Sequence, residues 1–173
     1  MHTINTSVLT LEPQVAEHAD EMFRVLSDPA IYEFENEPPP SAEWLRERFT
    51  RLESRHSGDG REQWLNWVIR LPTSELIGYV QASVQPGGRA SIGYELSSKY
   101  WGRGLASHAV RAMISELVKH YHVRTVSAVL KGANHRSLRL LVRLGFRRAE
   151  TESGARSAVE PDELLMQCDV QDM

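Results

Sequence analysis

The sequence predicts one α/β domain in which a mixed, mostly antiparallel sheet carries helices on both faces. Three strand-like runs in the middle of the chain, residues 63–71, 76–85 and 90–96, are separated by turn-forming residues, which favours an antiparallel meander. A helical segment then separates the third run from another at 125–130, and a helical crossover favours a parallel pair. A chain of 173 residues suits a single domain, 1–173.

The amino-terminal part predicts a strand and two helices. A short strand is expected at residues 8–11, and Pro13 suits the first position of a helix whose apolar face runs to Leu26. An acidic, aromatic segment follows and ends in three prolines at 38–40, which predicts a loop. Ser41 is a good N-cap for the second helix.

The carboxyl-terminal part alternates between helices and strands. A helix of about fourteen residues is expected from Leu105, because apolar residues recur there at helical spacing. A second helix is expected over 134–144, where Gly145 supplies a C′ glycine, and two last strands at 146–150 and 163–170. The predicted architecture is therefore a sheet between helices, with a ligand site at the carboxyl ends of the parallel strands.

Composition indicates an ordinary globular protein of a reducing compartment. Apolar residues make up 41% of the chain and charged residues 25%. The single cysteine, Cys168, excludes an intrachain disulfide. The chain has neither an apolar run of the roughly 20 residues that a membrane helix needs nor a signal-peptide pattern. We expect a cytoplasmic protein that does not associate with membranes.

Charge is distributed unevenly along the chain. Residues 117–149 contain eight Lys or Arg and no Asp or Glu, whereas residues 12–62 contain thirteen acids and six bases. A basic half suits nucleic acid or a polyphosphate, but the net charge of −3 and the lack of clustered basic tracts argue against nucleic acid. We expect a compact anionic ligand at the basic half and an amine near the acidic half.

A glycine turn, Gly102-Arg103-Gly104, lies between the strand that ends at Leu96 and the helix that begins at Leu105. Backbone N–H groups at a helix start lack intrahelical partners and lie at the positive end of the helix dipole, so such a turn suits a phosphate. An ordinary strand-to-helix connection is the alternative, because a short glycine motif is common.

A second motif makes the glycine turn much more specific. The helix over 134–144 opens with Asn134-His135-Arg136-Ser137 and runs into Leu144-Gly145-Phe146. Together with Trp101-Gly102-Arg103-Gly104-Leu105-Ala106, this pattern resembles the GNAT superfamily of acyl-CoA-dependent N-acyltransferases. It is closest to the branch of ribosomal-protein-alanine acetyltransferases. The resemblance covers almost the whole chain, although Trp101 stands where many members carry Gln or Arg, and it implies a sheet splayed at the parallel pair.

The resemblance implies that acetyl-CoA lies between the strand ending at Leu96 and the strand beginning at Thr125. The turn would hold the pyrophosphate, and a free N–H at the strand end would polarise the thioester carbonyl. Arg103 either adds a charge-assisted bond or is simply solvated, and Asn134 holds the pantetheine arm, caps its helix, or does both. The cofactor-binding residues implied are Leu96, Trp101, Gly102, Arg103, Gly104, Leu105, Ala106, Asn134 and Ser137.

The catalytic residues implied are Ser137 and Glu95. Many GNAT enzymes carry a tyrosine general acid where this chain has Leu141, and in the branch it resembles the Ser of Asn-x-x-Ser, here Ser137, is a proposed substitute. Glu95 is the best-placed candidate base, and its alternative is a solvated or salt-bridged strand carboxylate. No zinc-ligand spacing is present, and the direct ternary mechanism needs no metal.

The function that the resemblance implies is transfer of acetyl from acetyl-CoA to a primary amine. The acceptor would be a protein or peptide N-terminus or a small-molecule amine, which Tyr32, Glu33 and Glu35 of the acidic loop could recognise unless they are only solvated. A homodimer is a weaker expectation from the family. The alternative is a non-catalytic acyl-CoA-binding module, which Leu141 at the usual tyrosine position supports.

Overall fold

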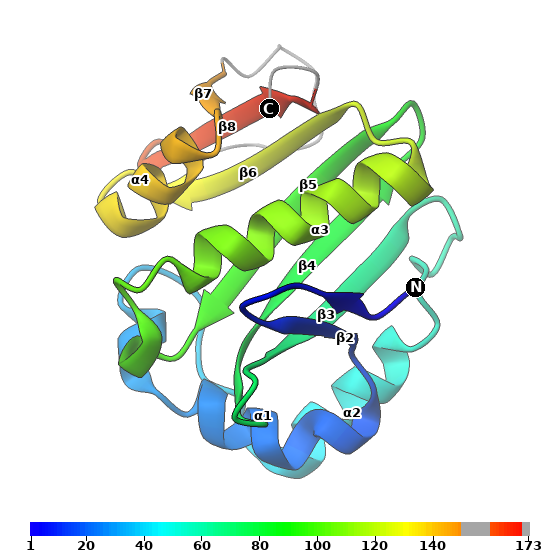
Figure 1. The fold of residues 1–173 in the computed structure, drawn as a ribbon, viewed down its shortest axis with the longest axis vertical. Coiled ribbons are helices and arrows are strands. Elements are labelled where there is room, and N and C mark those ends of the chain that lie inside the picture. Colours follow the sequence, from blue (N-terminus) through cyan, green and yellow to red (C-terminus); the bar gives the residue numbers. More distant parts are fainter. Residues whose placement is uncertain (150–159, 171–173) are drawn as a thin grey trace.

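The computed structural model describes residues 1–149 and 160–170 and contains one mixed sheet with helices on both faces (Figure 1). Among the described residues the sheet has eight strands in the order β1-β2-β3-β4-β5-β6-β8-β7. The strands are β1 (Ile4–Asn5), β2 (Thr10–Pro13), β3 (Gln63–Arg70), β4 (Leu76–Gln85), β5 (Arg89–Leu96), β6 (Thr125–Lys131), β7 (Arg147–Arg148) and β8 (Glu163–Asp169). The helices are α1 (Ala19–Leu26), α2 (Ala42–Leu52), α3 (Leu105–Tyr121) and α4 (His135–Arg143), with 3-10 turns at Ala16–His18, Pro29–Tyr32 and Ser98–Tyr100.

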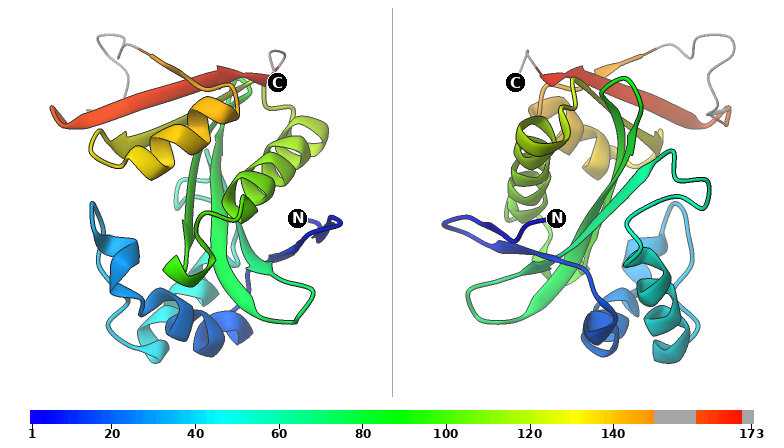
Figure 2. Two further views of the ribbon diagram at one scale, coloured as in Figure 1. Left: turned by 60° about the vertical axis from the view of Figure 1, so that its left-hand side comes forward. Right: turned by 90° about the vertical axis from the view of Figure 1, so that its right-hand side faces the viewer.

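Apolar side chains on the two faces of the sheet form two hydrophobic clusters. Val68 of β3 packs with Met22 of α1 and Phe49 of α2 on one face. Its neighbour Trp67 packs with residues of α3 and α4, such as Met113, on the other face, because successive side chains of a strand point to opposite sides. Figure 2 shows α1 and α2 on one side of the sheet and α3 on the other. The predicted arrangement with helices on both faces is confirmed.

The sheet splays between β5 and β6, which form its parallel pair. Their ladder pairs only Arg89–Ser91 with Thr125–Ser127, at the start of each strand. Beyond this point β6 stays paired with β8 along its whole length, while β5 continues in its ladder with β4. Figure 1 shows the carboxyl ends of β5 and β6 diverging, with α4 beside β6 and the start of α3 beside β5. The predicted parallel pair and splay are confirmed.

The amino-terminal boundaries differ from the prediction. The first strand of the prediction, 8–11, lies at Thr10–Pro13, so Pro13 ends β2 rather than beginning a helix. The pairing of β1 with β2 ends before Pro13. Proline has no backbone N–H, and at this position β1 offers no acceptor that such an N–H would have bonded. The helical segment starts at Ala16, after Val15 in an extended conformation. The two-residue strand β1 was not predicted from the sequence.

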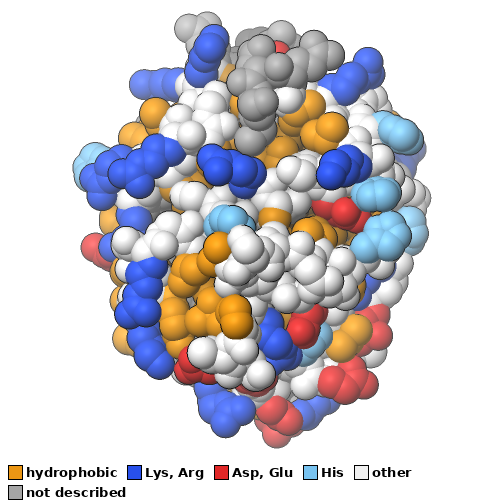
Figure 3. All heavy atoms as spheres, in the orientation of Figure 1, with side chains coloured by type: hydrophobic (Ala, Val, Ile, Leu, Met, Phe, Trp, Pro, Cys, Tyr) orange, Lys and Arg blue, Asp and Glu red, His pale blue; other side chains and the backbone are white. Residues whose placement is uncertain are grey.

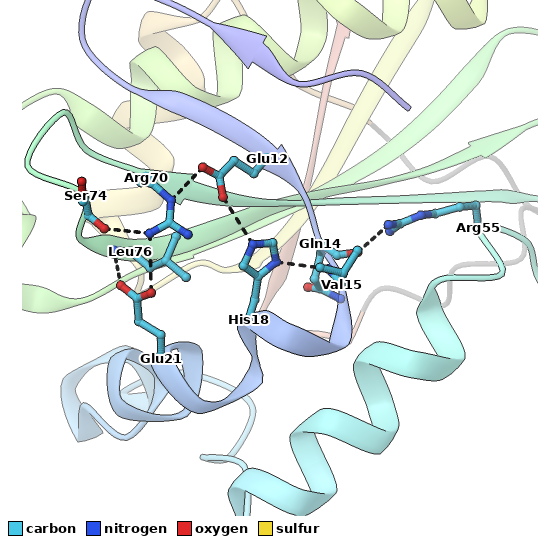
Figure 4. Close-up of polar contacts among 9 residues, drawn as sticks. All are labelled: Glu12, Gln14, Val15, His18, Glu21, Arg55, Arg70, Ser74 and Leu76. Carbon is cyan, nitrogen blue, oxygen red and sulfur yellow. Dashed lines mark hydrogen bonds and ion pairs between the residues drawn. The ribbon is translucent and has the colours of Figure 1, made fainter.

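A polar network fastens the amino-terminal helices to the sheet (Figure 4). Arg70 at the end of β3 donates from Nε to Glu12 Oε1 at 2.7 Å and pairs with Glu21 of α1 at 3.5 Å. Glu21 also accepts from the N–H of Leu76 at 2.9 Å, and His18 lies 3.3 Å from Glu12. Its hydrogen bond with Arg70 holds the pKa of Glu12 below the usual value, although partial burial opposes this.

Later helices and strands agree with the prediction except at their ends. The helix expected to span about fourteen residues continues as α3 to Tyr121, and His122 ends it in a left-handed conformation. Gly145 follows α4 with φ +88°, as a C′ glycine does. The predicted strand 146–150 is described only at Arg147–Arg148, and Glu150 lies outside the described residues. No helix of the described part has the length and apolar character needed to cross a bilayer.

Candidate active site

The glycine turn leads directly into α3 and presents its main chain to open space. Gly102 and Gly104 have φ of +74° and +75°, and Gly104 is the N-cap of α3. A Cβ at either glycine would meet no protein atom within 4 Å, so these glycines serve the backbone conformation and not packing. The first intrahelical bond runs from His108 N to Gly104 O at 3.0 Å, which leaves the N–H groups of residues 105–107 without intrahelical acceptors.

A cavity of 340 Å³ lies in front of this turn, and α4 supplies its basic wall. Arg136, Arg139 and Arg143 line it from one face of α4, and Figure 3 shows Lys and Arg side chains gathered around this helix. The Arg136 guanidinium lies 3.5 Å from the centre of the Trp101 ring, a cation–π contact between the two motifs. Main-chain donors and arginines on facing walls suit a polyphosphate.

Trp101 also fixes the end of β5. Its indole Nε1 donates to Leu96 O at 2.8 Å. The next residue, Ser97, donates from its N–H to Ile77 O of β4 at 2.9 Å. Because successive residues of a strand direct their N–H and C=O groups to opposite sides, the N–H of Leu96 points away from β4 and into the splay. The predicted main-chain donor therefore faces the cavity that Leu96 lines.

A pair of hydroxyl groups crosses the splay between β5 and α4. Asn134 is the N-cap of α4 and accepts from Ser137 N at 3.0 Å, so its capping role is confirmed. The Ser137 hydroxyl lies 2.6 Å from the Tyr94 hydroxyl. Burial and the Glu35 charge raise the pKa of Tyr94 to about 12 although Ser137 opposes this, so Tyr94 is a neutral phenol at neutral pH. Tyr94 was not predicted as a site residue.

Glu95 lies where three cavities meet. It lines the cavity at the glycine turn, a second of 360 Å³ between the diverging ends of β5 and β6, and a third of 300 Å³ between the sheet and α2. Burial raises the pKa of Glu95, and Glu35 adds to this effect. Hydrogen bonds from Tyr79 and from Asn36, whose Nδ2 lies 3.2 Å from Oε1, lower it. Glu95 is therefore not a fully solvated carboxylate.

Polar side chains from several elements surround the second and third cavities. Four amide side chains line the third cavity together with the carboxylate of Glu37: Gln14, Asn36, Asn66 and Gln81. Gln14 is buried, and its Nε2 has no hydrogen-bond partner among the described residues. Trp44 lines the same cavity and is 39% exposed. These walls suit a polar ligand rather than an apolar one.

The acidic loop lies against these cavities, but its three candidate residues have different surroundings. Glu35 lines the second cavity, and burial and then the Glu163 charge raise its pKa while Lys131 lowers it. The Tyr32 hydroxyl donates to Leu26 O at 2.7 Å, and Glu33 lies 4.0 Å from Arg136. Of the three, Glu35 is therefore the residue that lines the second cavity and has a carboxyl group with a raised pKa.

Asp28 joins the acidic loop to the segment that follows β5. Its Oδ2 accepts from Ser98 N at 2.7 Å and its Oδ1 accepts from Ala30 N at 3.1 Å. Partial burial opposes ionisation, but these hydrogen bonds outweigh it and hold the pKa of Asp28 below the usual value. One carboxylate thus joins the start of the acidic loop to the 3-10 turn Ser98–Tyr100, which precedes the glycine turn.

Arg103, a predicted cofactor-binding residue, and Leu141, at the usual tyrosine position, differ in their surroundings. Arg103 is not among the described residues that line the first cavity, and its guanidinium lies 5.6 Å from the centre of the Tyr100 ring. Leu141 is buried and lines the second cavity. A larger hollow of 850 Å³ lies around Gly88 and Arg124, near the start of β5, and none of the predicted site residues lines it.

Comparison with known proteins identifies relatives over most of the chain. The sequence profile of a family described as "Acetyltransferase (GNAT) domain" matches residues 9–147. An uncharacterized N-acetyltransferase, p20 of Bacillus licheniformis, is 29% identical over 150 residues, which cover 86% of this chain and 84% of the relative. The uncharacterized N-acetyltransferase YoaA of Bacillus subtilis is 34% identical over 87 residues, 49% of each chain.

Solved structures show the same fold at low sequence identity. The RimL ribosomal alpha-N-protein acetyltransferase in complex with coenzyme A superposes with a TM-score of 0.82 at 16% identity, over 99% of this chain and 100% of that one. The ribosomal-protein-S5-alanine acetyltransferase of Vibrio fischeri gives 0.80 at 20% identity, over 99% and 98%. An aminoglycoside acetyltransferase in complex with coenzyme A gives 0.75 at 20% identity, over 95% and 96%.

Proposed function

The chain belongs to the GNAT acetyltransferase family, and from this premise we propose that it moves acetyl from acetyl-CoA to a primary amine by direct attack in a ternary complex. The observation that carries the proposal is the position of Glu95, which lines the cavity at the glycine turn and both cavities beyond it. A largely desolvated carboxylate between a basic cavity and a polar one is placed to act on an amine that meets an acyl donor.

Residues of the first cavity fit acetyl-CoA. The open space at Gly102 and Gly104 and the unbonded N–H groups of residues 105–107 suit the pyrophosphate, and the arginines of α4 face them. Bound acetyl-CoA supplies an acyl group activated as a thioester. The N–H of Leu96 points into the splay and would stabilise negative charge that develops on the acyl oxygen.

Glu95 acts as the base in this proposal. A primary amine with a pKa of about 10.4 is mostly protonated at neutral pH, so a group that accepts its proton raises the fraction able to attack. The raised pKa of Glu95 brings the carboxylate closer to the working pH and makes it a better acceptor. Glu95 takes the proton directly or through a water as the new C–N bond forms, and later returns it to solvent.

Ser137 and Tyr94 act on the leaving group. When the C–S bond breaks, the thiolate needs a proton, and the Ser137 hydroxyl donates it or a hydrogen bond in its place. Tyr94 lies 2.6 Å from that hydroxyl and, with its pKa raised to about 12, remains a donor that can restore the proton. The pair supplies a phenol near the place where the family tyrosine is missing at Leu141, which weakens the case for a non-catalytic module.

The acceptor class is a primary amine with polar surroundings. Three carboxylates, of Glu35, Glu37 and Glu95, line the second and third cavities against one arginine, Arg48, and this balance favours a cationic group. A protein or peptide N-terminus is the first candidate, in line with two similar structures named for ribosomal-protein acetylation. A small polyamine-like molecule is the second, in line with the aminoglycoside acetyltransferase.

Calorimetry with acetyl-CoA and thiol release with a panel of peptide and small-molecule amines test the proposal. We expect 1:1 acetyl-CoA binding and amine-dependent thiol release, and Glu95→Gln should lower kcat/KM by roughly 100-fold without changing acetyl-CoA affinity. Glu47→Gln, an exposed residue of α2, is the matched control. No acetyl-CoA binding would exclude the proposal, and binding without turnover by any amine would leave the non-catalytic module.

A further inference from the structure

Two histidines and a glutamate come together where the amino-terminal segment meets the carboxyl-terminal half of α3. His2 precedes β1, whereas Glu116 and His120 lie one turn apart on α3. The possible ligand atoms of the three residues all lie within 4.8 Å of one another. On the face drawn in Figure 3, histidine side chains gather beside an acidic one where Figure 1 places the amino-terminus near the end of α3.

Glu116 is an unusual residue at this place. It is 8% exposed, and a buried carboxylate normally needs a cation or several hydrogen bonds. The ion-pair partners it has in the described part of the chain are His2, with Nδ1 2.8 Å from Oε1, and His120, with Nε2 3.6 Å from Oε2. Both partners are imidazoles, which serve equally as metal ligands.

We infer that His2, Glu116 and His120 form a binding site for a divalent transition metal such as Zn²⁺. Two imidazoles and one carboxylate are a donor set that Zn²⁺ accepts, with water as a fourth ligand. Zinc–ligand bonds of about 2.0–2.2 Å place neighbouring ligand atoms of a tetrahedron roughly 3.3 Å apart. His2 Nδ1 lies 2.8 Å from Oε1 and His120 Nε2 lies 3.6 Å from Oε2, on either side of this value. One ligand atom from each of the three residues lies within 4.8 Å of the others, so side-chain rotations bring them onto one ion.

The fold holds both halves of the site before a metal arrives. Glu116 and His120 are four residues apart on one helix, which places them on the same face. The buried indole of Trp67 donates to His2 O at 3.0 Å, and β1, which pairs with β2, begins two residues after His2. The His2 and His120 rings lie 4.9 Å apart. Ligands that are already positioned lose little conformational freedom on binding.

The site would be structural rather than part of acetyl transfer. Glu116 lies eleven residues beyond Leu105, the first residue of α3, which at about 1.5 Å per residue is roughly 17 Å from the glycine turn. A bound ion would join the amino-terminal segment to α3, and α3 also presents the turn of the candidate active site. Because the unfolded chain does not bring His2 near Glu116, metal binding stabilises the folded state.

Metal titration of the full chain, carrying no polyhistidine tag, tests this inference. We expect Zn²⁺ to bind with 1:1 stoichiometry in calorimetry and to raise Tm by about 5 °C at a hundredfold excess over Kd. Co²⁺ bound at the same place should show the d–d absorption of a four- or five-coordinate ion. Each of His2→Ala, His120→Ala and Glu116→Gln should weaken Zn²⁺ binding at least tenfold.

The two histidines are well exposed, so their variants test the site without a folding defect. His56→Ala, which removes an exposed histidine from another part of the surface, is the matched control and should bind Zn²⁺ as the unchanged chain does. Absence of saturable Zn²⁺ binding would overturn the inference. Equal affinity of the His2, His120 and His56 variants would overturn it as well, because binding would then lie elsewhere.

Discussion

The two sides of the candidate active site are built in different ways. The side at the glycine turn uses main-chain N–H groups of residues 102–106 and arginines of α4, two stretches that each form one motif of the sequence. The opposite side collects single side chains from β3, β4, α2 and the acidic loop. A site made from the backbone of one turn leaves a local signature, whereas a site made from scattered side chains does not.

The two sides also differ in charge. Three arginines of α4 line the first cavity, whereas Glu35 and Glu37 line the cavities beyond it together with a single arginine, Arg48. Glu95 belongs to both sides and is largely desolvated between them. We therefore expect changes at the glycine turn to alter acetyl-CoA affinity, and changes at Glu95 or in the cavities beyond it to alter turnover.

Replacement of Gly104 by alanine should have the largest effect on cofactor binding. A Cβ at this position would project into the space assigned to the phosphate, and the φ of +75° is unfavourable for alanine. We expect Gly104→Ala to weaken acetyl-CoA binding by roughly 100-fold in calorimetry, a loss of about 2.7 kcal/mol.

Gly60→Ala is the matched control for this change. Gly60 has φ of +70°, and a Cβ added there would also meet no protein atom within 4 Å, so alanine has the same backbone cost in a loop remote from the site. Equal acetyl-CoA affinity of the two variants would show that the turn does not hold the cofactor.

The hydroxyl pair should contribute to turnover and not to binding. Tyr94→Phe and Ser137→Ala should each lower kcat about tenfold, because each removes a donor from the path to the leaving sulfur. If the hydroxyls act in series, the double variant should be little worse than the worse single variant. If the reduction in kcat of the double variant equals the product of the two single reductions, Tyr94 and Ser137 act independently.

The pH profile distinguishes a base at Glu95 from a carboxylate that only shapes the cavity. The ionised form accepts the proton, so kcat/KM should fall as pH falls through the pKa of Glu95, by up to tenfold per pH unit. Because burial raises this pKa, the inflection should lie above the ordinary value of 4.5. Glu95→Gln should remove this acid limb. An acid limb unchanged in that variant would assign it to another group.

The smallest expected effect lies away from both sides of the site, in the network around Arg70. Arg70→Met should lower the free energy of unfolding by about 1 kcal/mol at pH 7, since its pair with Glu12 is partly exposed. The lowered pKa of Glu12 means that this contribution is present above the ordinary value of 4.5 and is lost as pH falls through the folded-state pKa. The difference in free energy of unfolding between the unchanged protein and the Arg70→Met variant should therefore become smaller in acid.

Denaturant unfolding at several pH values measures this difference in free energy of unfolding. Arg46→Met, which breaks the more exposed pair with Asp20, should cost less at every pH. If the loss of unfolding free energy caused by Arg70→Met is the same at pH 7 and pH 3, the arginine stabilises the fold through packing alone. Acetyl-CoA affinity should stay the same in both variants, because neither arginine lines the three cavities.

Much of the fold could be predicted because its signals are local. The strand runs of β3, β4 and β5 are separated by turn residues, and Ser41 and Asn134 cap the helices that they were expected to cap. The predicted start of the first helix was wrong because Pro13 suits either the first turn of a helix or the last residue of a strand. Its pairing with Trp67 of β3 decided between the two. Strand β1 was not predicted because its two residues are too few to show the alternation of apolar and polar side chains that indicates a strand.

The sequence by itself determined the glycine turn, the Asn134 cap and the family, because these depend on backbone conformation and short spacing. Only the tertiary structure decided that the Tyr94 hydroxyl meets Ser137, that Glu95 is partly buried among three cavities, and that His2 reaches Glu116 from 114 residues away. The physical reason is that desolvation and side-chain contact arise from elements distant in the chain, and no local pattern records where those elements meet.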